Sequence, residues 1–109
     1  MSAKTLRQVC ETLEVSRRAV QGYEKEGLVT ASGRNERGWL LYDEECQEQI
    51  KLVKFYQQLG LTVKGIGVFL NAPKECQKQI LCERQEILRS EIKERKELLE
   101  QITKILDVL

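Results

Sequence analysis

The 109-residue sequence predicts a mainly helical protein: a small domain with one β-hairpin (residues 1–71) followed by a long helix (residues 74–109). Two observations support this prediction. The first part alternates short amphipathic segments with turn-forming residues, whereas the second contains no glycine or proline and is rich in charge. The only proline of the chain lies between them, in Asn71-Ala72-Pro73, and marks the boundary.

Two short helices joined by a tight turn are expected near the N-terminus. Thr5 suits the N-cap of a first helix over residues 6–13, where apolar residues recur at helical spacing. Ser16 suits the N-cap of a second helix over residues 17–26, which Gly27 would end. This order of elements predicts a helix-turn-helix.

The next segment, residues 28–42, predicts a small β-hairpin. Serine, glycine and asparagine between positions 32 and 38 favour turns, and the apolar run 39–42 is typical of a strand. The expected tip, residues 34–37, reads Arg-Asn-Glu-Arg and is therefore charged.

Two further helices should complete the small domain. Asp43 suits the N-cap of a third helix that stops at Gly60, and Thr62 suits the N-cap of a fourth. The fourth helix contains two glycines, each of which costs about 0.5–1 kcal/mol relative to alanine, so it should be short. Its inner side is expected to carry Val63, Ile66, Phe69 and Leu70.

Residues 74–109 predict a helix of about 50 Å, which is too long to fold back on one small domain. Its heptad pattern is typical of a coiled coil with a second helix. The expected dimerisation residues are Leu81, Gln85, Leu88, Ile92, Arg95, Leu99, Ile102 and Leu106.

The second predicted helix carries one polar side that suits DNA. At 100° per residue, one arc of about 140° carries polar residues and glycine, and the opposite side is apolar. The arc holds Arg17, Arg18, Gln21, Gly22 and Lys25, and the apolar side holds Ala19, Val20 and Tyr23. Arginine and glutamine can pair with base edges in a major groove, whereas a lysine at the C-terminal end suits a phosphate. A solvated helix face is the alternative for any such arc, but the neighbouring turn and hairpin favour DNA recognition.

The hairpin tip places two arginines beside Trp39, which suits phosphate or minor-groove contact. A polar turn whose tryptophan fills the core is the alternative, and both interpretations of Trp39 can hold. The complete set of candidate DNA-contacting residues is Ser16, Arg17, Arg18, Gln21, Gly22, Tyr23, Lys25, Arg34, Arg37, Trp39, Thr62 and Lys64.

Composition narrows the class of protein. The net charge is only +1, although residues 1–42 hold seven basic and five acidic residues, so DNA affinity must come from a local surface. The chain has no histidine and no glycine-rich phosphate loop, so neither an enzyme nor a cofactor is indicated. No apolar run suits a signal peptide or a membrane span, and four cysteines in such a chain favour reduced thiols, so the cytoplasm is the expected compartment.

Three blocks of the sequence together resemble the MerR family of bacterial transcription regulators: residues 5–28 with Tyr-Glu and Gly-Leu, residues 37–43 around Gly-Trp, and residues 59–70 beginning Leu-Gly-Leu-Thr. The resemblance implies a winged helix-turn-helix whose hairpin is the wing, and a homodimer joined by an antiparallel coiled coil. It implies double-stranded DNA with an inverted-repeat operator as the target. RNA polymerase at a promoter is a further partner that it implies.

The antiparallel pairing that the resemblance implies leads to an expected register of the coil. Setting Gln85 opposite Arg95 of the second copy keeps both away from aliphatic residues and places Leu81 opposite Leu99 of that copy. A slide by one heptad gives nearly the same overlap and is the alternative.

Several positions depart from the family pattern. Gln21-Gly22 stands where Arg-Tyr is usual, and Leu40 stands where the wing usually carries arginine. Glu14 occupies a turn position where glycine is frequent, and a left-handed backbone there would cost about 1 kcal/mol.

Other functions stay open on the sequence alone. The same fold could serve a recombination or phage accessory factor that bends DNA, or the coil could be the working part of a protein-interaction module. A thiol- or metal-responsive regulator could act through Cys76, near the start of the long helix, where thiol-metal sensors of the family place one ligand. Cys76 and Cys82 lie about 240° apart around a helix and cannot share an ion on one face, so no metal site is expected.

Overall fold

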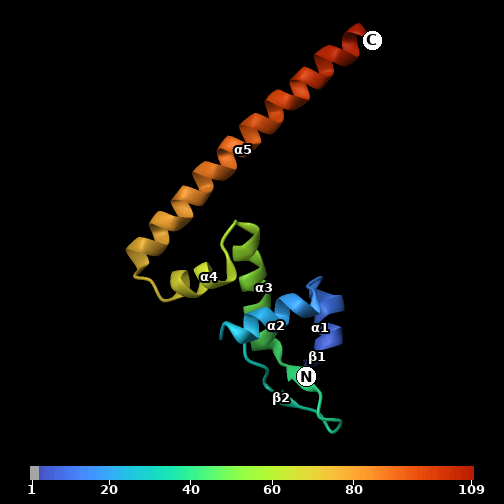
Figure 1. Ribbon diagram of the computed structural model, residues 1–109, viewed down its shortest axis with the longest axis vertical. Helices are drawn as coiled ribbons and strands as arrows, with labels where there is room; N and C mark the ends of the chain where they lie inside the picture. The colour runs from blue at the N-terminus through green and yellow to red at the C-terminus, as the bar shows by residue number, and fades with distance from the viewer. Residues whose placement is uncertain (1–2) are drawn as a thin grey trace. The chain divides into compact units, whose positions relative to one another are not determined.

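The computed structural model describes residues 3–109, which divide into two compact units, one ending at Asn71 and one beginning at Ala72. The predicted order of helices and hairpin is confirmed (Figure 1). The first unit contains α1 (Leu6–Leu13), α2 (Arg17–Lys25), α3 (Glu44–Gln58) and α4 (Val63–Leu70), with strands β1 (Lys4–Thr5), β2 (Gly33–Arg34) and β3 (Leu40–Tyr42). The second contains α5 (Lys74–Val108).

The four predicted N-caps are confirmed. The side chains of Thr5, Ser16, Asp43 and Thr62 each accept a hydrogen bond from the backbone N–H three residues later, over 2.9–3.4 Å. Helix α2 ends at Lys25, one residue earlier than expected, and Gly27 follows with a φ of +74° as the predicted C-terminal glycine.

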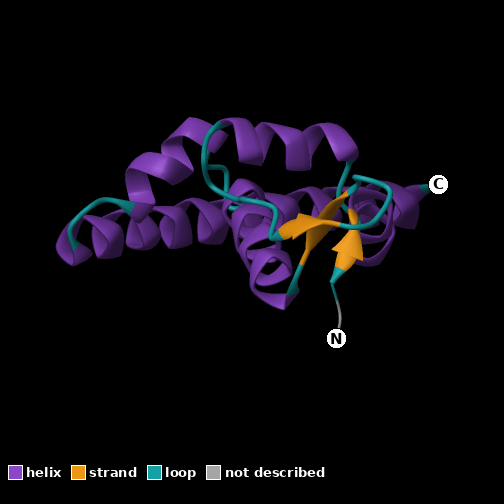
Figure 2. Cartoon of the chain, turned by 90° about the horizontal axis from the view of Figure 1, so that it is seen from below, coloured by secondary structure: helices purple, strands orange, loops and turns teal. Residues whose placement is uncertain are grey.

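The sheet has one strand more than the sequence predicted. The hairpin of β2 and β3 is extended by β1, which pairs antiparallel with β3 and gives the order β1-β3-β2 (Figure 2). Lys4 lies opposite Tyr42, and Gly33 lies opposite Leu41. The sequence does not predict β1 because two residues are too few to show strand periodicity. Since β1 leads directly into α1, its pairing with β3 connects the start of the helix-turn-helix to the wing.

The core of the first unit lies where helices α1 to α4 meet the sheet. Its fully buried side chains come from every one of these helices, from the loop after α2 and from β3; they are Val9, Val20, Tyr23, Val29, Tyr42, Ile50 and Ile66. The prediction for α4 holds at Ile66 and Phe69, which are buried, and at Val63, which packs against the core. It is wrong at Leu70, which is 41% exposed in the last turn of the helix.

Helix α5 is one continuous helix of 35 residues. No side chain along it is buried, and its large apolar residues from Leu81 to Leu109 are exposed, Leu99 by 63%. None of the helices within residues 3–109 combines the length and the hydropathy of a membrane-spanning segment.

Candidate nucleic-acid interface

The polar arc of α2 faces solvent. Arg17, Arg18, Gln21 and Lys25 are all exposed, and within residues 3–109 no hydrogen bond or ion pair engages their side chains. On the opposite side of the helix Val20 is fully buried, as the helical wheel predicted. The arc therefore holds three cationic groups and one amide that remain available to an external ligand.

Two buried tyrosines fix the rotation of α2 about its axis. The hydroxyl of Tyr23 donates to Oε1 of Gln57 in α3, and the hydroxyl of Tyr42 in β3 donates to Oε1 of Glu24 over 2.9 Å. Burial raises the pKa of both phenols above the ordinary value of 10.0, and the Glu24 carboxylate raises the pKa of Tyr42 further. Both hydroxyls therefore stay protonated donors at neutral pH, and α2 is held from α3 and from the wing.

The turn between α1 and α2 is held by Lys54 of α3, a residue that no sequence pattern connects with this turn. Glu14 has a φ of 54°, so the left-handed backbone considered for this position is present. The ammonium group of Lys54 in α3 donates to the backbone oxygens of Leu13, at 3.0 Å, and Glu14, at 2.7 Å. No periodicity or local motif connects positions so far apart in the chain, so sequence reasoning had no signal for this contact.

The wing is stiffened by hydrogen bonds within its own turn. Oδ1 of Asn35 accepts from the backbone N–H groups of Arg37, at 2.9 Å, and Trp39, at 3.0 Å, and Nη1 of Arg34 donates to the Gly38 carbonyl at 2.6 Å. The sequence predicts Asn35 only as a turn-forming residue. An asparagine side chain that accepts from the backbone two residues later forms an Asx-turn, and this motif could have indicated the conformation of the wing tip.

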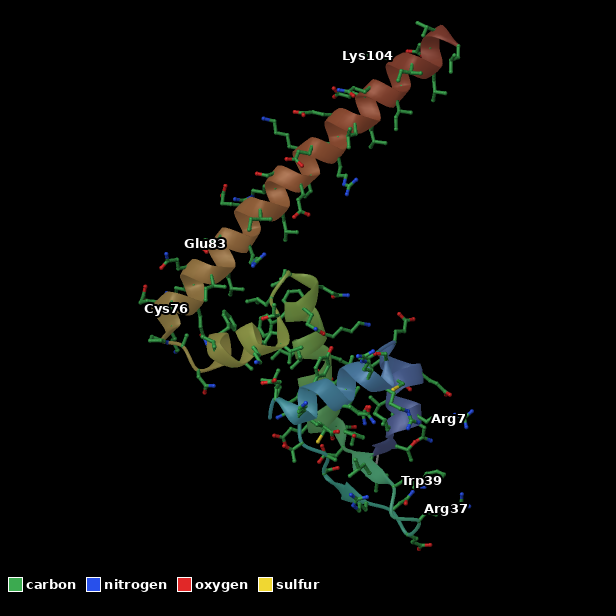
Figure 3. All side chains as sticks on the ribbon, viewed as in Figure 1. Arg7, Arg37, Trp39, Cys76, Glu83 and Lys104 are labelled. Carbon is green, nitrogen blue, oxygen red and sulfur yellow. The ribbon has the colours of Figure 1, made fainter. Side chains whose placement is uncertain are left out.

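Arg37 and Trp39 form one exposed group at the end of the wing (Figure 3). The Arg37 guanidinium carbon lies 5.4 Å from the centre of the Trp39 ring, within the range of a cation–π contact. Trp39 is 54% exposed, so the alternative in which it fills the core is wrong. The wing thus presents a cation on a flat aromatic support.

The remaining candidates occupy different environments. Ser16, Thr62 and Lys64 are exposed at the starts of α2 and α4, although the two hydroxyls already serve as N-caps. Gly22 is partly exposed on α2. Tyr23 is only 1% exposed, because its ring belongs to the core, so it positions α2 and cannot reach DNA from this conformation.

The cysteines do not gather into a site. Cys46 is buried, its thiol donates to the Thr30 carbonyl over 2.9 Å, and burial raises its pKa. Cys76 and Cys82 are exposed on α5. In the part of the chain that the structure describes, no three His, Cys, Asp or Glu side chains lie together in a way that could hold a metal ion.

The arc of α2 and the wing together suit a polyanion whose base edges offer hydrogen-bond donors and acceptors. Arginine pairs bidentately with guanine, glutamine pairs with adenine, and lysine suits phosphate. A helix that offers these groups, with a cationic wing in the same domain, has the composition of a double-stranded DNA reader.

Comparison with known proteins agrees with this interpretation. Residues 4–72, covering the helix-turn-helix, the wing, α3 and α4, match the model of the family described as MerR HTH family regulatory protein. The HTH-type transcriptional regulator YfmP of Bacillus subtilis (strain 168) is 29% identical over 101 residues, which cover 92% of this chain and 70% of that protein.

Solved structures share the fold over nearly the whole chain. HiNmlR, a MerR family regulator lacking the sensor domain and bound to promoter DNA, has a TM-score of 0.73 at 21% identity, covering 96% of this chain and 88% of that one. The N-terminal part of MtaN, the multidrug transporter activator of Bacillus subtilis, has a TM-score of 0.67 at 25% identity, covering 94% of this chain and 97% of that one.

Proposed function

The chain belongs to the MerR HTH family, whose members are DNA-binding transcription regulators, and from this premise we propose that it acts as a homodimer on an inverted-repeat operator. In this proposal each protomer places α2 in the major groove of one half-site and its wing along the adjacent backbone. The supporting observation is the exposed arc of α2, whose arginines, glutamine and lysine have no partner within residues 3–109.

Each side chain of the arc has a proposed role. Arg17, Arg18 and Gln21 read base edges, and Lys25, in the last turn of α2, contacts a phosphate. Arg34 and Arg37 of the wing contact phosphates, and Thr62 and Lys64, at the start of α4, meet the backbone. The exposed ring of Trp39 supports Arg37 in this contact.

The homodimer is proposed from α5. A helix with a/d aliphatic residues over 35 positions, none of them buried in the single chain, has its apolar stripe open to water. Pairing with a second copy would cover that stripe and present two α2 helices to one duplex, as a two-fold symmetric operator requires. HiNmlR, which shares the fold, was solved on promoter DNA, and this supports a promoter as the site of action. RNA polymerase would then be the neighbouring protein.

Selection from a random DNA library tests the proposal directly. The full chain should enrich an inverted repeat whose half-sites lie about one helical turn apart, or a multiple of it. Sedimentation of the same preparation should give the mass of a dimer. Enrichment of no sequence, or a strictly monomeric protein that binds a single half-site, would contradict it.

A double variant locates the binding surface. Arg17→Ala with Gln21→Ala should weaken operator binding by about 1–3 kcal/mol for each lost base contact. The matched control is Lys93→Ala with Gln101→Ala, which removes the same kinds of group from exposed positions of α5 outside the predicted coiled-coil seam.

Footprinting on genomic fragments shows where the protein binds. Sites between promoter elements support transcription regulation, and sites at recombination repeats support an accessory role in recombination.

A further inference from the structure

Gly22 lies in the sixth position of the nine-residue helix α2, where glycine is unfavourable. A glycine inside a helix lowers its stability relative to alanine, because it loses more conformational freedom on folding. Glycine is nevertheless used where a ligand or another part of the chain needs the space of the missing side chain. The surroundings of Gly22 therefore show whether that need arises inside the protein.

Within residues 3–109, nothing requires a glycine at this position. Apart from its chain neighbours and the backbone of its own helix, a Cβ atom built on Gly22 would have no heavy atom within 4 Å. The φ of Gly22 is not in the left-handed region. Other glycines have internal reasons: Gly27 and Gly38 have positive φ, and a Cβ on Gly65 would lie 3.0 Å from Oγ1 of Thr62. The space over Gly22 is open to the outside.

The open space borders the cationic arc. Arg18 lies four residues before Gly22 and Lys25 three residues after it, so the three share one strip of the helix surface. Both charged side chains are exposed, and neither has a hydrogen-bond or ion-pair partner within residues 3–109. A bare stretch of backbone between two free cations suits a ligand that is anionic and comes close to the main chain.

We propose that Gly22 is the point of closest approach between α2 and DNA, where the duplex occupies the space that a side chain would fill. The inference rests on the proposed DNA-binding function and goes beyond it. Arg18 pairs with a base edge on one side of this point and Lys25 holds a phosphate on the other, and the missing Cβ lets the helix sit deeper in the groove. Gly22 thereby controls affinity without supplying any hydrogen-bonding side chain.

The test uses the full chain and the operator that it selects from a random library. Gly22→Ala should raise the melting temperature by about 4 °C, because helix propensity improves and no atom is displaced. The same variant should bind the operator about tenfold more weakly or worse. Gly22→Leu should bind more weakly still. Stability and affinity therefore move in opposite directions, which a purely structural role would not produce.

Gly67→Ala is the matched control. Gly67 is also helical, in α4, and its Cβ would meet Cδ2 of Leu28 at 3.7 Å, an ordinary contact. This variant should gain stability and keep wild-type affinity. If Gly22→Ala binds the operator as tightly as the wild type, the inference is overturned while the DNA-binding function stands. If the wild type enriches no DNA sequence, the proposed function fails, and the inference fails with it.

Discussion

The ammonium group of Lys54 lies 2.7 Å from the backbone oxygen of Glu14, forty residues earlier in the chain. It also donates to the Leu13 oxygen at 3.0 Å. Both carbonyls belong to the C-terminal end of α1, where backbone acceptors lack helical partners and the helix dipole favours a cation. Helix α3 thereby fixes the turn that directs α2 away from α1.

Replacing this lysine tests how strongly the turn depends on it. Lys54→Met keeps most of the aliphatic stem and removes the donor, so it should lower the free energy of unfolding by about 1–3 kcal/mol. Operator affinity should fall as well, because the orientation of α2 relative to the rest of the domain is less rigidly fixed. Lys51→Met, which loses only a bond to the exposed Glu48 on the same helix, should change stability by about 0–1 kcal/mol. Equal urea midpoints for the two variants would disprove the role of Lys54.

A substitution at Glu14, the residue of the same turn with a left-handed backbone, should raise stability, whereas Lys54→Met should lower it. Glu14 has a φ of 54°, which strains any residue with a Cβ, so Glu14→Gly should raise stability by about 0.5–1 kcal/mol. Glu11→Gly, inside α1, should lower it by about 0.5–1 kcal/mol, since glycine weakens a helix interior. Thermal unfolding of both variants measures the difference. A fall in melting temperature for Glu14→Gly would show that the turn is not strained.

These contacts show which parts of the molecule could be predicted from the sequence. The N-caps at Ser16 and Asp43, and the terminal glycine at position 27, act within a few residues, so local patterns revealed them. The inward and outward sides of α2 followed from helical geometry alone. For the site, this was enough to identify the exposed arc.

Long-range contacts were not predictable in the same way. The bond from Tyr42 to Glu24 and the pairing of β1 with β3 join segments that no periodicity connects. The sequence places Tyr23 both among the DNA-contacting candidates and on the inner side of α2, and only its burial and its bond to Gln57 distinguish the two. Leu70 was misplaced because α4 is only two turns long, so its wheel defines the inner side poorly.

The buried tyrosine of β3 predicts an alkaline loss of stability. Because burial and then Glu24 raise the pKa of Tyr42 in the folded state above 10.0, the unfolded chain ionises first as pH rises. The contribution is fully present below pH 10 and is lost above it, by about 1.4 kcal/mol per pH unit, until pH passes the folded pKa. Tyr42→Phe lacks this contribution, so its unfolding free energy should fall less steeply above pH 10. Parallel curves for the two proteins would contradict the argument.

The wing arginine predicts a salt-dependent effect. If Arg37 contacts a phosphate, Arg37→Ala should lower operator affinity and reduce the slope of log affinity against log salt by about 0.9. Stability should hardly change, because the guanidinium is exposed and its contact is to the exposed Trp39 ring. Lys104→Ala removes one exposed cation from α5 and should leave the slope unchanged. Titrations at several salt concentrations give the slopes, and an unaltered slope for Arg37→Ala would place the wing away from phosphate.

The proposed pairing of α5 can be tested by disulfide cross-linking. In the antiparallel register, Leu81 lies opposite Leu99 of the second copy, while the two positions within one helix are about 27 Å apart. In a background with Cys76→Ser and Cys82→Ser, a chain carrying Leu81→Cys together with Leu99→Cys should form covalent dimers on mild oxidation. A disulfide needs Cα atoms within about 7 Å, so either cysteine alone should leave the chains separable.

The single variants distinguish the direction of pairing. Parallel helices would place each position opposite itself, so Leu81→Cys alone would then cross-link efficiently. A register shifted by one heptad would instead set Leu81 opposite Ile92 or Leu106 of the second copy, and the pair of cysteines at 81 and 99 would stay reduced. Denaturing gels without reductant read all three outcomes. Gln85 and Arg95 explain why the first register should prevail, because a shift by one heptad in either direction buries at least one of them against an aliphatic side chain without a polar partner.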